Sequence, residues 1–261
     1  MFNALMGSPD RWKQIVDAVR AAGRCTVAEL MELTGASDMT IRRDLEALAA
    51  QGLLERYRGG ARSLILRGDE PPFALRVQEG LELKRRLAAQ VAQLISDGES
   101  VLLDSGTTCL EVARALAGRR LTIMPLSLHA ANALTGAAQV RLLLPGGEPR
   151  PGELALTGPL TEASIAALRF DTAVIGCCGL TAQSGLTAYD LADAAVKRAA
   201  IAAARRVIAV AEGTKLTRTA LAVVAPAASI TTIVTDDGAP AAATEALAGA
   251  GVTIQTVRTE A

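Results

Sequence analysis

The chain has 261 residues, a length that favours two domains, or one large domain with a small one. Its 27 basic and 27 acidic side chains leave no net charge, which excludes a uniformly basic nucleic-acid coat but not a local basic patch. Half of the residues are apolar and only 2% are aromatic, so stacking platforms for single-stranded nucleic acid are largely excluded.

A single histidine, His129, limits the chemistry of the chain. It excludes a multi-histidine metal site, and we expect it on a helix surface. The four cysteines include no Cys-x-x-Cys pair, which favours reduced thiols. The segment 1–8 is too short for a signal peptide, and charges interrupt the apolar stretches well before the length of a membrane span. We therefore expect a soluble cytoplasmic protein without metal or cofactor.

The first fifty residues predict three short helices. Ser8-Pro9-Asp10 has the composition of a helix start, and apolar residues then recur at helical spacing over 12–19. Thr26–Glu29 fits a capping box that opens a second helix. A third helix is predicted over 37–51. The brief turn between the second and third helices predicts a helix-turn-helix.

The predicted third helix has a polar face at its N-terminal end. Ile41, Leu45 and Leu48 share one buried face, because they lie three and four residues apart. Polar and basic residues therefore fall on the outer side, at the end that a recognition helix inserts into the major groove of DNA. The alternative is an ordinary solvated pair of arginines, whose charge Asp44 or Glu46 could partly neutralise.

A β-hairpin is predicted directly after this helix, where a winged helix has its wing. Residues 53–58 alternate apolar and polar side chains, and Gly59-Gly60 is predicted to turn the chain before 61–65. From Thr40 to Arg67 six arginines stand against three acidic residues, a local charge of +3 that suits phosphates. We expect DNA to be contacted by Ser37, Met39, Thr40, Arg42, Arg43, Arg56, Arg58 and Arg62.

Three motifs of this region stand in order: Thr40-Ile41-Arg42-Arg43-Asp44-Leu45, Gln51-Gly52-Leu53-Leu54 and Arg58-Gly59-Gly60-Ala61. Together they resemble the signature of the DeoR family of bacterial transcription regulators. The resemblance runs without a gap from about Arg11 to Ala61. One departure is Tyr57-Arg58, where family members often have Arg-His. The arginine keeps the positive charge at that place.

A charged segment with two prolines precedes a larger α/β region. It predicts a linker at 67–79, between a winged helix-turn-helix domain at 8–66 and a sensing domain at 80–258. Aliphatic strands alternating with helices predict a mostly parallel sheet with both faces covered. Strands are predicted at 100–104, 121–125, 140–144, 172–176, 206–211, 231–235 and 252–257, and helices at about 80–96, 107–117, 190–204 and 240–249.

One loop of this region has the composition of an anion cradle. Parallel sheets bind ligands at the carboxyl ends of their strands, and Asp104-Ser105-Gly106-Thr107-Thr108 lies between a predicted strand and a helix. Gly106 permits a tight turn, and three hydroxyls stand beside the free amides of a helix start, which suits a phosphate. The loop lacks the P-loop pattern, so nucleotide hydrolysis is not expected. A plain Ser/Thr helix cap is the alternative.

Other loops at the same edge carry glycines and charged residues. Gly146-Gly147 follows one predicted strand and 176–179 another, and glycines let the backbone approach a ligand closely. Two lysines and an aspartate nearby could hold a phosphorylated polyol, although a lone lysine is more often a solvated surface residue. We expect an effector to be bound by Asp104, Ser105, Gly106, Thr107, Thr108, Gly146, Gly147, Gly179, Asp190, Lys197 and Lys215.

Five motifs here resemble, in order, those of the DeoR-type sensor domain: Asp104–Thr108, Gly146-Gly147, Gly176 to Gly179, Val196-Lys197-Arg198 and Glu212-Gly213-Thr214-Lys215. The resemblance as a whole covers about 11–257. It implies a fold similar to ribose-5-phosphate isomerase and the coenzyme A transferases. It also implies a domain that binds a phosphorylated sugar or related metabolite without chemistry. The chain departs from the family at Pro125-Leu126, where Thr-Asn is common, and at Glu212, where Asp is usual.

The leading hypothesis is a sequence-specific DNA-binding regulator. We expect a repressor of carbohydrate metabolism genes that a phosphorylated sugar releases from its double-stranded operator. Because one small winged helix covers little DNA, we expect a homo-oligomer, a dimer or a tetramer, with no membrane partner.

Two other hypotheses belong to different classes. One is a sugar-phosphate isomerase, although such an enzyme has no need of a helix-turn-helix. Its acid-base groups would be Asp104, Glu212, Lys197 and Lys215. The other is a redox sensor that uses Cys177 and Cys178, which are more often small core residues than nucleophiles.

Overall fold

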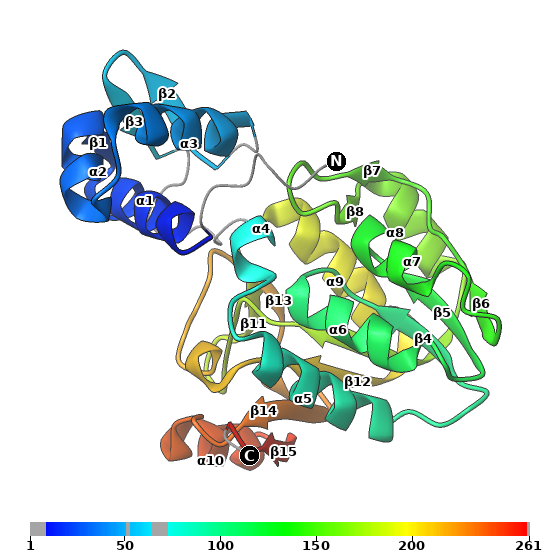
Figure 1. Ribbon diagram of the computed structural model, residues 1–261. Coiled ribbons are helices and arrows are strands. Elements are labelled where there is room, and N and C mark those ends of the chain that lie inside the picture. Colours follow the sequence, from blue (N-terminus) through cyan, green and yellow to red (C-terminus); the bar gives the residue numbers. More distant parts are fainter. Residues whose placement is uncertain (1–8, 51–52, 64–72, 260–261) are drawn as a thin grey trace. The chain divides into compact units, whose positions relative to one another are not determined.

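The computed structural model describes residues 9–50, 53–63 and 73–259. The chain divides into two compact units, Met1–Leu75 (unit 1) and Arg76–Ala261 (unit 2). Figure 1 shows unit 1 as a small helical unit with a hairpin, and unit 2 as helices around a central sheet. The predictions for Ser8, for Gln51-Gly52 and for 64–72 of the second hairpin strand and the linker lie outside the described residues.

Unit 1 contains the three predicted helices, α1 (Pro9–Ala22), α2 (Val27–Thr34) and α3 (Asp38–Ala50). The predicted capping box opens α2. The Thr26 hydroxyl accepts a hydrogen bond from the Glu29 amide at 3.2 Å, and the Glu29 carboxylate accepts one from the Thr26 amide at 2.7 Å. Gly35 ends α2 in the left-handed conformation, with φ of 68°. A brief turn therefore separates α2 from α3, and the predicted helix-turn-helix is confirmed.

The predicted wing follows α3 as a hairpin of β2 (Glu55–Tyr57) and β3 (Gly60–Arg62). The position predicted for the turn is wrong by one residue. Gly60 pairs with Tyr57 in the ladder, so Arg58 and Gly59 form the turn. Gly59 has φ of 100°, a conformation that favours glycine at a hairpin turn.

A third strand, β1 (Arg24–Thr26), pairs with β3 and gives the order β1-β3-β2. This pairing explains the second glycine of the wing. A Cβ atom at Gly60 would lie 2.2 Å from the carbonyl oxygen of Cys25, so no larger residue fits where the two backbones meet. The sequence does not predict β1, because a strand of three residues is too short to establish an alternating pattern.

Aliphatic side chains from all three helices form the core of unit 1. Ile41, Leu45 and Leu48, the predicted inner face of α3, are at most 1% exposed. Burying each such side chain stabilises the fold by about 1.5–3 kcal/mol. This burial fixes the rotation of α3 about its own axis, and so decides which of its side chains point outward.

Unit 2 is built on a seven-stranded sheet in the order β15-β14-β12-β9-β4-β5-β6. Every neighbouring pair is parallel, so the predicted mostly parallel sheet is confirmed. The strands are β4 (Ser100–Leu103), β5 (Leu121–Pro125), β6 (Val140–Leu142), β9 (Phe170–Gly176), β12 (Ala204–Val210), β14 (Thr232–Asp236) and β15 (Thr253–Val257).

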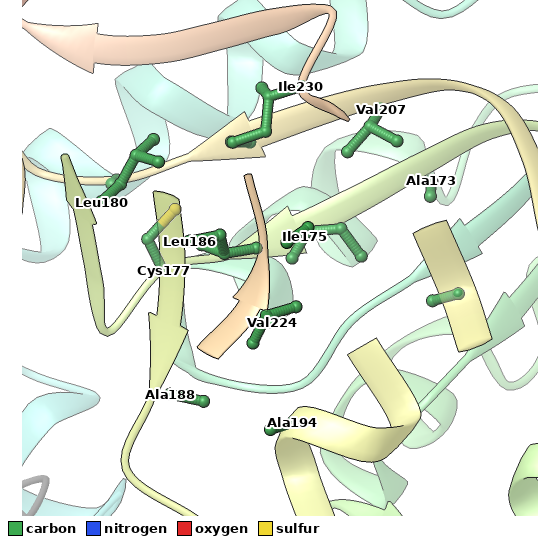
Figure 2. Close-up of a cluster of buried hydrophobic side chains, with 14 of the residues drawn as sticks. Ala173, Ile175, Cys177, Leu180, Leu186, Ala188, Ala194, Val207, Val224 and Ile230 are labelled. Carbon is green, nitrogen blue, oxygen red and sulfur yellow. The ribbon is translucent and has the colours of Figure 1, made fainter. Parts of the chain in front are cut away.

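Both faces of this sheet are covered by helices, because successive residues of each strand point to opposite sides. Val174 and Ile208 pack with α5, α6 and α7 on one face. Ala173, Ile175 and Val207 pack with α8, α9 and α10 on the other, as Figure 2 shows for part of that cluster. The helices are α5 (Leu81–Gln93), α6 (Thr107–Leu116), α7 (Leu128–Leu134), α8 (Pro159–Ala166), α9 (Leu191–Ala203) and α10 (Ala241–Gly249).

Shorter elements lie in the connections of unit 2, and the sequence analysis does not predict them. An antiparallel sheet has the order β10-β11-β13, and β7 pairs with β8 in a small hairpin. In the described part of the chain, no helix combines the length and apolar character needed to cross a bilayer. The elements are α4 (Phe73–Arg76), β7 (Glu148–Pro149), β8 (Leu156–Thr157), β10 (Gly179–Thr181), β11 (Gly185–Ala188), η1 (Gly213–Lys215), β13 (Ala222–Ala225) and η2 (Ala227–Ser229).

The order of the strands reverses between β4 and β9. From β4 the sheet continues through β5 and β6 on one side, and through β9, β12, β14 and β15 on the other. In parallel sheets, ligands bind at the carboxyl ends of the strands beside such a reversal. Asp104 follows β4 and Cys177 follows β9, so these two loops lie at that position.

Candidate functional site

The outer side of α3 carries the residues expected to contact DNA. Met39 is 80% exposed, Arg42 and Arg43 are exposed, and Thr40 is half-buried. Ser37 caps the helix: its hydroxyl accepts a hydrogen bond from the Thr40 amide at 3.3 Å and lies 2.9 Å from the Thr40 hydroxyl. Polar groups and the positive end of the helix dipole are therefore turned to the same side.

One acidic residue of α3, Asp44, does not act as the sequence suggests. Asp44 points into unit 1, where its carboxylate accepts hydrogen bonds from the Arg11 guanidinium at 2.6 Å and the Trp12 indole at 2.9 Å. The suggestion that it neutralises the outer arginines is therefore wrong. Asp38 takes that part instead, because it pairs with Arg42 at 2.5 Å across one helical turn. The spacing of four residues between them is the signal that would have predicted this pair.

The arginines of the wing differ in how their charge is used. Arg62 pairs with Glu55 directly across the hairpin, at 2.5 Å. Arg56 and Arg58 are exposed, and neither forms an ion pair with any of the described residues. The positive charge that the wing offers to a partner therefore comes mainly from Arg56 and Arg58.

In unit 2 a buried ion pair joins the two halves of the sheet. The Asp104 carboxylate, after β4, accepts a hydrogen bond from the Lys197 ammonium of α9 and another from the Gly176 amide of β9 at 2.9 Å. Asp193, one turn earlier on α9, lies 3.5 Å from the same ammonium. All three charged residues are buried. The structure thus brings together Asp104 and Lys197, two of the residues that the sequence predicts for the effector site.

Burial and charge act in opposite directions on this cluster. Burial raises the pKa of Asp104 above its ordinary value, and the Lys197 ammonium opposes that shift. Burial alone would lower the pKa of Lys197, but the carboxylates of Asp104 and Asp193 outweigh it and raise the pKa well above its ordinary value. Lys197 is therefore charged at neutral pH, and its ammonium favours the ionised form of Asp104 against the effect of burial.

The loop after Asp104 leads into a helix without a side-chain cap. Gly106 is the N-cap residue of α6, with φ of 96°, and no side chain caps the amides of the first turn. The alternative of a Ser/Thr cap is therefore wrong. Ser105 and Thr107 are buried, while Gly106 and Thr108 are half-buried. The first-turn amides are the donors that an anion at a helix start requires, and the three hydroxyl residues adjoin them in the chain.

The remaining glycines of the expected site serve packing between segments. A Cβ atom at Gly147 would lie 1.9 Å from the Thr161 hydroxyl of α8, and the Gly146 carbonyl accepts a hydrogen bond from that hydroxyl at 2.7 Å. A Cβ atom at Gly179 would lie 2.4 Å from the carbonyl oxygen of Arg218. These contacts account for the glycines without a ligand.

The other charged residues of the expected site are spread along the same edge. Asp190 caps α9 by accepting a hydrogen bond from the Asp193 amide at 2.8 Å, and Arg150 lies 3.6 Å from its carboxylate. Lys215 is half-buried in η1, after β12. Near it, Glu212 lies 3.9 Å from the buried Lys84 of α5. Lys84 and Arg150 are not predicted from the sequence, because their partners Glu212 and Asp190 are distant in the chain.

Burial shifts the pKa values of two cysteines and of the histidine in unit 2. Burial raises the pKa of Cys177 to about 12 and that of Cys109 well above its ordinary value, so neither forms a thiolate at neutral pH. Cys177, one of the two thiols of the redox hypothesis, is therefore poorly suited to act as a nucleophile. His129 is half-buried on α7, and burial lowers its pKa. Among the described residues, no group of three or more His, Cys, Asp or Glu side chains is placed to hold a metal ion.

Comparison with known proteins gives matches to both units. Residues 11–65 match the DeoR-like helix-turn-helix domain, and residues 79–237 match the DeoR C terminal sensor domain. The chain is 36% identical over 231 residues to the transcriptional repressor AccR of Agrobacterium fabrum, covering 88% of this chain and 90% of that one. It is 32% identical over 243 residues to the glycerol-3-phosphate regulon repressor of Escherichia coli K12, covering 93% and 96%.

A solved structure of ribose 5-phosphate isomerase A from Methanocaldococcus jannaschii is also similar in part. It aligns with a TM-score of 0.40 and 14% identity, over 52% of this chain and 55% of that one. A likeness at this level carries no conclusion about activity.

The buried pair gives a prediction about stability. Lys197→Met leaves the carboxylates of Asp104 and Asp193 buried without a cation, and we expect it to cost roughly 3–5 kcal/mol of the free energy of unfolding. The loss should shrink as the pH falls toward the ordinary pKa of an aspartate, because the folded pKa of Asp104 is already raised and should rise further once the ammonium is removed. A carboxyl whose folded pKa is raised binds protons more readily in the folded state, so folding gains stability on acidification.

Urea denaturation of full-length protein at several pH values measures this. Arg198→Met is the matched control: Arg198 is the next residue of α9, is exposed and donates a hydrogen bond to the Val223 carbonyl at 2.7 Å, so a loss of about 0.5–1.5 kcal/mol is expected. Equal losses for the two variants would mean that the pair does not stabilise the fold.

Proposed function

The chain belongs to the DeoR family, and from that premise we propose that it is a transcription regulator. Unit 1 would bind double-stranded operator DNA, and unit 2 would bind a phosphorylated sugar or a related metabolite that releases the operator. The names of the relatives, a transcriptional repressor and the repressor of a glycerol-3-phosphate regulon, favour repression of carbohydrate genes. Such a protein would act in the cytoplasm.

The observation that carries DNA binding is the outward face of α3 beside the wing. Arg43 is exposed on the side of α3 opposite its buried face, where a guanidinium can make two hydrogen bonds to a guanine. Ser37 and Thr40, at the start of α3, would contact phosphate, and Met39 would make apolar contact with a base. Residues contributing mainly charge would be Arg42, Arg56, Arg58 and Arg62.

The ion pairs of these arginines indicate which of them are most available to bind phosphate. Arg42 and Arg62 already pair with carboxylates, so a phosphate would have to compete with Asp38 and Glu55 for them. A phosphate that contacts Arg56 or Arg58 would not have to displace a carboxylate, so these two arginines are the stronger candidates for phosphate contacts. Because one winged helix spans a single short site, we propose a homo-oligomer, a dimer or a tetramer, that pairs half-sites.

For the effector, the start of α6 is the best candidate. Its amides lack a side-chain cap and lie beside the hydroxyls of Ser105, Thr107 and Thr108, so a phosphate would find both a positive helix end and several donors there. Lys215 and Arg150 at the same edge would add charge. Lys197 would act indirectly, by holding Asp104 and with it the loop, because its ammonium is already paired with carboxylates.

The departure from the family at Pro125-Leu126 has a consequence for this site. Pro125 pairs with Leu103 in the sheet, and Leu126 is 1% exposed and packs in the core beside Leu102. An apolar pair at the end of β5 offers a ligand no hydroxyl or amide side chain. Recognition of the sugar would therefore rely on residues of the neighbouring loops.

Catalysis is not proposed. The isomerase alternative needs a free acid or base, yet Asp104 and Lys197 neutralise each other in a buried pair. Glu212 faces the buried Lys84. The winged helix also has no part in such a reaction. The observed pairing and the family of the chain both favour a binding domain.

DNA recognition can be tested with a duplex selected from a random pool by the full-length protein. Arg43→Ala should weaken binding of this duplex by roughly 1–3 kcal/mol and relax specificity at one position, if the guanidinium contacts a base. Arg56→Gln should weaken binding of all duplexes alike and lower the salt dependence by about one released ion. Fluorescence anisotropy at several salt concentrations measures both.

Arg169→Ala, at an exposed site in unit 2, is the control and should leave binding unchanged. If Arg43→Ala retains the affinity of the wild type, Arg43 does not contact a base.

Effector binding can be tested by thermal unfolding. Glycerol 3-phosphate or ribose 5-phosphate, but not the unphosphorylated parent, should raise the melting temperature, because a ligand of the folded state stabilises it by about 2.7 kcal/mol at a hundredfold excess over its Kd. Thr108→Val removes a hydroxyl from the first turn of α6 and should reduce the shift. Thr244→Val makes the same change at the start of α10 and should not. Equal shifts in the two variants would place the phosphate elsewhere.

A further inference from the structure

The hairpin of β7 and β8 contains a tight turn over residues 150–154, here called the β7–β8 turn. The Arg150 carbonyl accepts a hydrogen bond from the Leu154 amide at 2.8 Å, and the Arg150 amide donates to the Ala155 carbonyl at 2.7 Å. Leu154 has φ of 50° and is the single non-glycine residue with positive φ in the described part of the chain. A conformation that L residues rarely adopt is maintained only where surrounding contacts enforce it.

This turn is attached to the edge of the sheet where the candidate effector site lies. The Leu128 amide donates to the Leu154 carbonyl at 2.9 Å, and Ser127 forms an antiparallel bridge with Ala155. Ser127 follows β5, which pairs with β4, the strand that ends at Asp104. The turn therefore lies beside the carboxyl ends of β4 and β5.

One end of the turn carries a guanidinium whose hydrogen bonds are incomplete. Arg150 lies 3.6 Å from the Asp190 carboxylate, beyond ordinary hydrogen-bond distance. Its Nε is buried and has no hydrogen-bond partner among the described residues. Asp190 already accepts a hydrogen bond as the cap of α9. A buried unsatisfied donor is costly, and an anion bound here would satisfy it.

The other end of the turn holds the first residue of unit 2. The Arg76 guanidinium donates to both oxygens of the Glu153 carboxylate, at 2.7 and 2.6 Å. The two side chains are only 9% and 12% exposed, so water screens this pair weakly. Only three peptide bonds separate Arg150 from Glu153. Arg150 faces Asp190 at the start of α9, whereas Glu153 faces Arg76 at the start of unit 2.

A second contact fixes the same stretch of backbone. The Lys84 ammonium donates to the carbonyl oxygens of Arg76 and Glu79, at 2.5 Å each. It also lies 3.9 Å from Glu212, in the loop that contains Lys215. Burial lowers the pKa of Lys84, with Glu212 opposing that shift. The segment from Arg76 to Glu79 is therefore held at two points: by Glu153 of the β7–β8 turn, and by Lys84, which also lies near Glu212.

Arg76 is directly continuous with unit 1 along the chain. It is the last residue of α4, and its neighbour Leu75 packs against the core of unit 1. A change in the position of Arg76 therefore acts on the chain at the point where it leaves unit 2.

We propose that the β7–β8 turn transmits the occupancy of the effector site to the start of unit 2. In this proposal, which rests on the proposed function, Arg150 binds the anionic group of the effector in place of its long contact with Asp190. The turn then shifts and changes the Glu153–Arg76 ion pair. Ligand and DNA affinities become coupled because the two states of the turn differ in both contacts.

Glu153→Gln tests the transmission, because it keeps the shape of the side chain and removes its charge. The readouts are the melting-temperature shift with glycerol 3-phosphate and the ratio of duplex Kd values with and without that ligand, both for the full chain. The variant should keep the shift, while the ratio, about 5–150 for a coupled pair of sites, should fall close to one. Glu148→Gln, at an exposed site of the same hairpin, should keep both. Arg150→Gln should lose the shift itself.

Three results would overturn the proposal. The first is a Glu153→Gln variant that the ligand releases from DNA as readily as the wild type. The second is an Arg150→Gln variant with an undiminished shift. The third is an Arg76→Gln/Glu153→Gln double variant with wild-type coupling. This double variant replaces the single variant if Glu153→Gln unfolds the protein, because it removes both charges of the pair and leaves neither buried alone.

Failure of the proposed function would have a different signature. The wild type would then bind the selected duplex but gain no thermal stability from any sugar phosphate, and the role of Arg150 would fall with it. The role of the Glu153–Arg76 ion pair would still be tested by the affinity of the variants for the duplex in the absence of ligand. Glu153→Gln should change that affinity at least severalfold relative to Glu148→Gln, and equal affinities would overturn the transmission through Arg76.

Discussion

The buried ion pair between Asp104 and Lys197 is the interaction on which the candidate effector site depends. The Asp104 carboxylate joins three elements that are distant in sequence: its own strand β4, the end of β9 through the Gly176 amide, and α9 through Lys197. It lies where the strand order reverses, between β4 and β9. The loop that follows, with Gly106 at the start of α6, has its position set by this pair.

The architecture follows from the sequence wherever a periodic pattern is long enough. The inner face of α3 and the aliphatic strands of unit 2 are predicted correctly, because burial on one face or both imposes a period on the residues. Prediction from the sequence fails where the pairing of strands determines the local structure. The turn of the wing is misplaced by one residue, since either glycine of Gly59-Gly60 could form it, and only the pairing of Gly60 with Tyr57 settles the choice. The three residues of β1 carry no pattern at all.

The candidate sites are predictable to a smaller extent. Composition indicates the loop Asp104–Thr108, because hydroxyl residues around a glycine between a strand and a helix suit an anion at a helix start, but it does not separate this use from a plain helix cap. Composition does not indicate that Gly147 packs against α8, or that Asp44 points inward to Arg11 and Trp12. Arg76 and Glu153 are 77 residues apart, so their pairing is set by the tertiary fold alone.

If a ligand in unit 2 is coupled to DNA on unit 1 of the same chain, thermodynamic reciprocity requires each partner to weaken the binding of the other by an equal factor. Isothermal titration of glycerol 3-phosphate into the free protein, and into the protein saturated with its selected duplex, gives two affinities. The ligand should bind the DNA complex more weakly, by the same factor by which it weakens DNA binding. Equal affinities of free and DNA-bound protein for the ligand would contradict it.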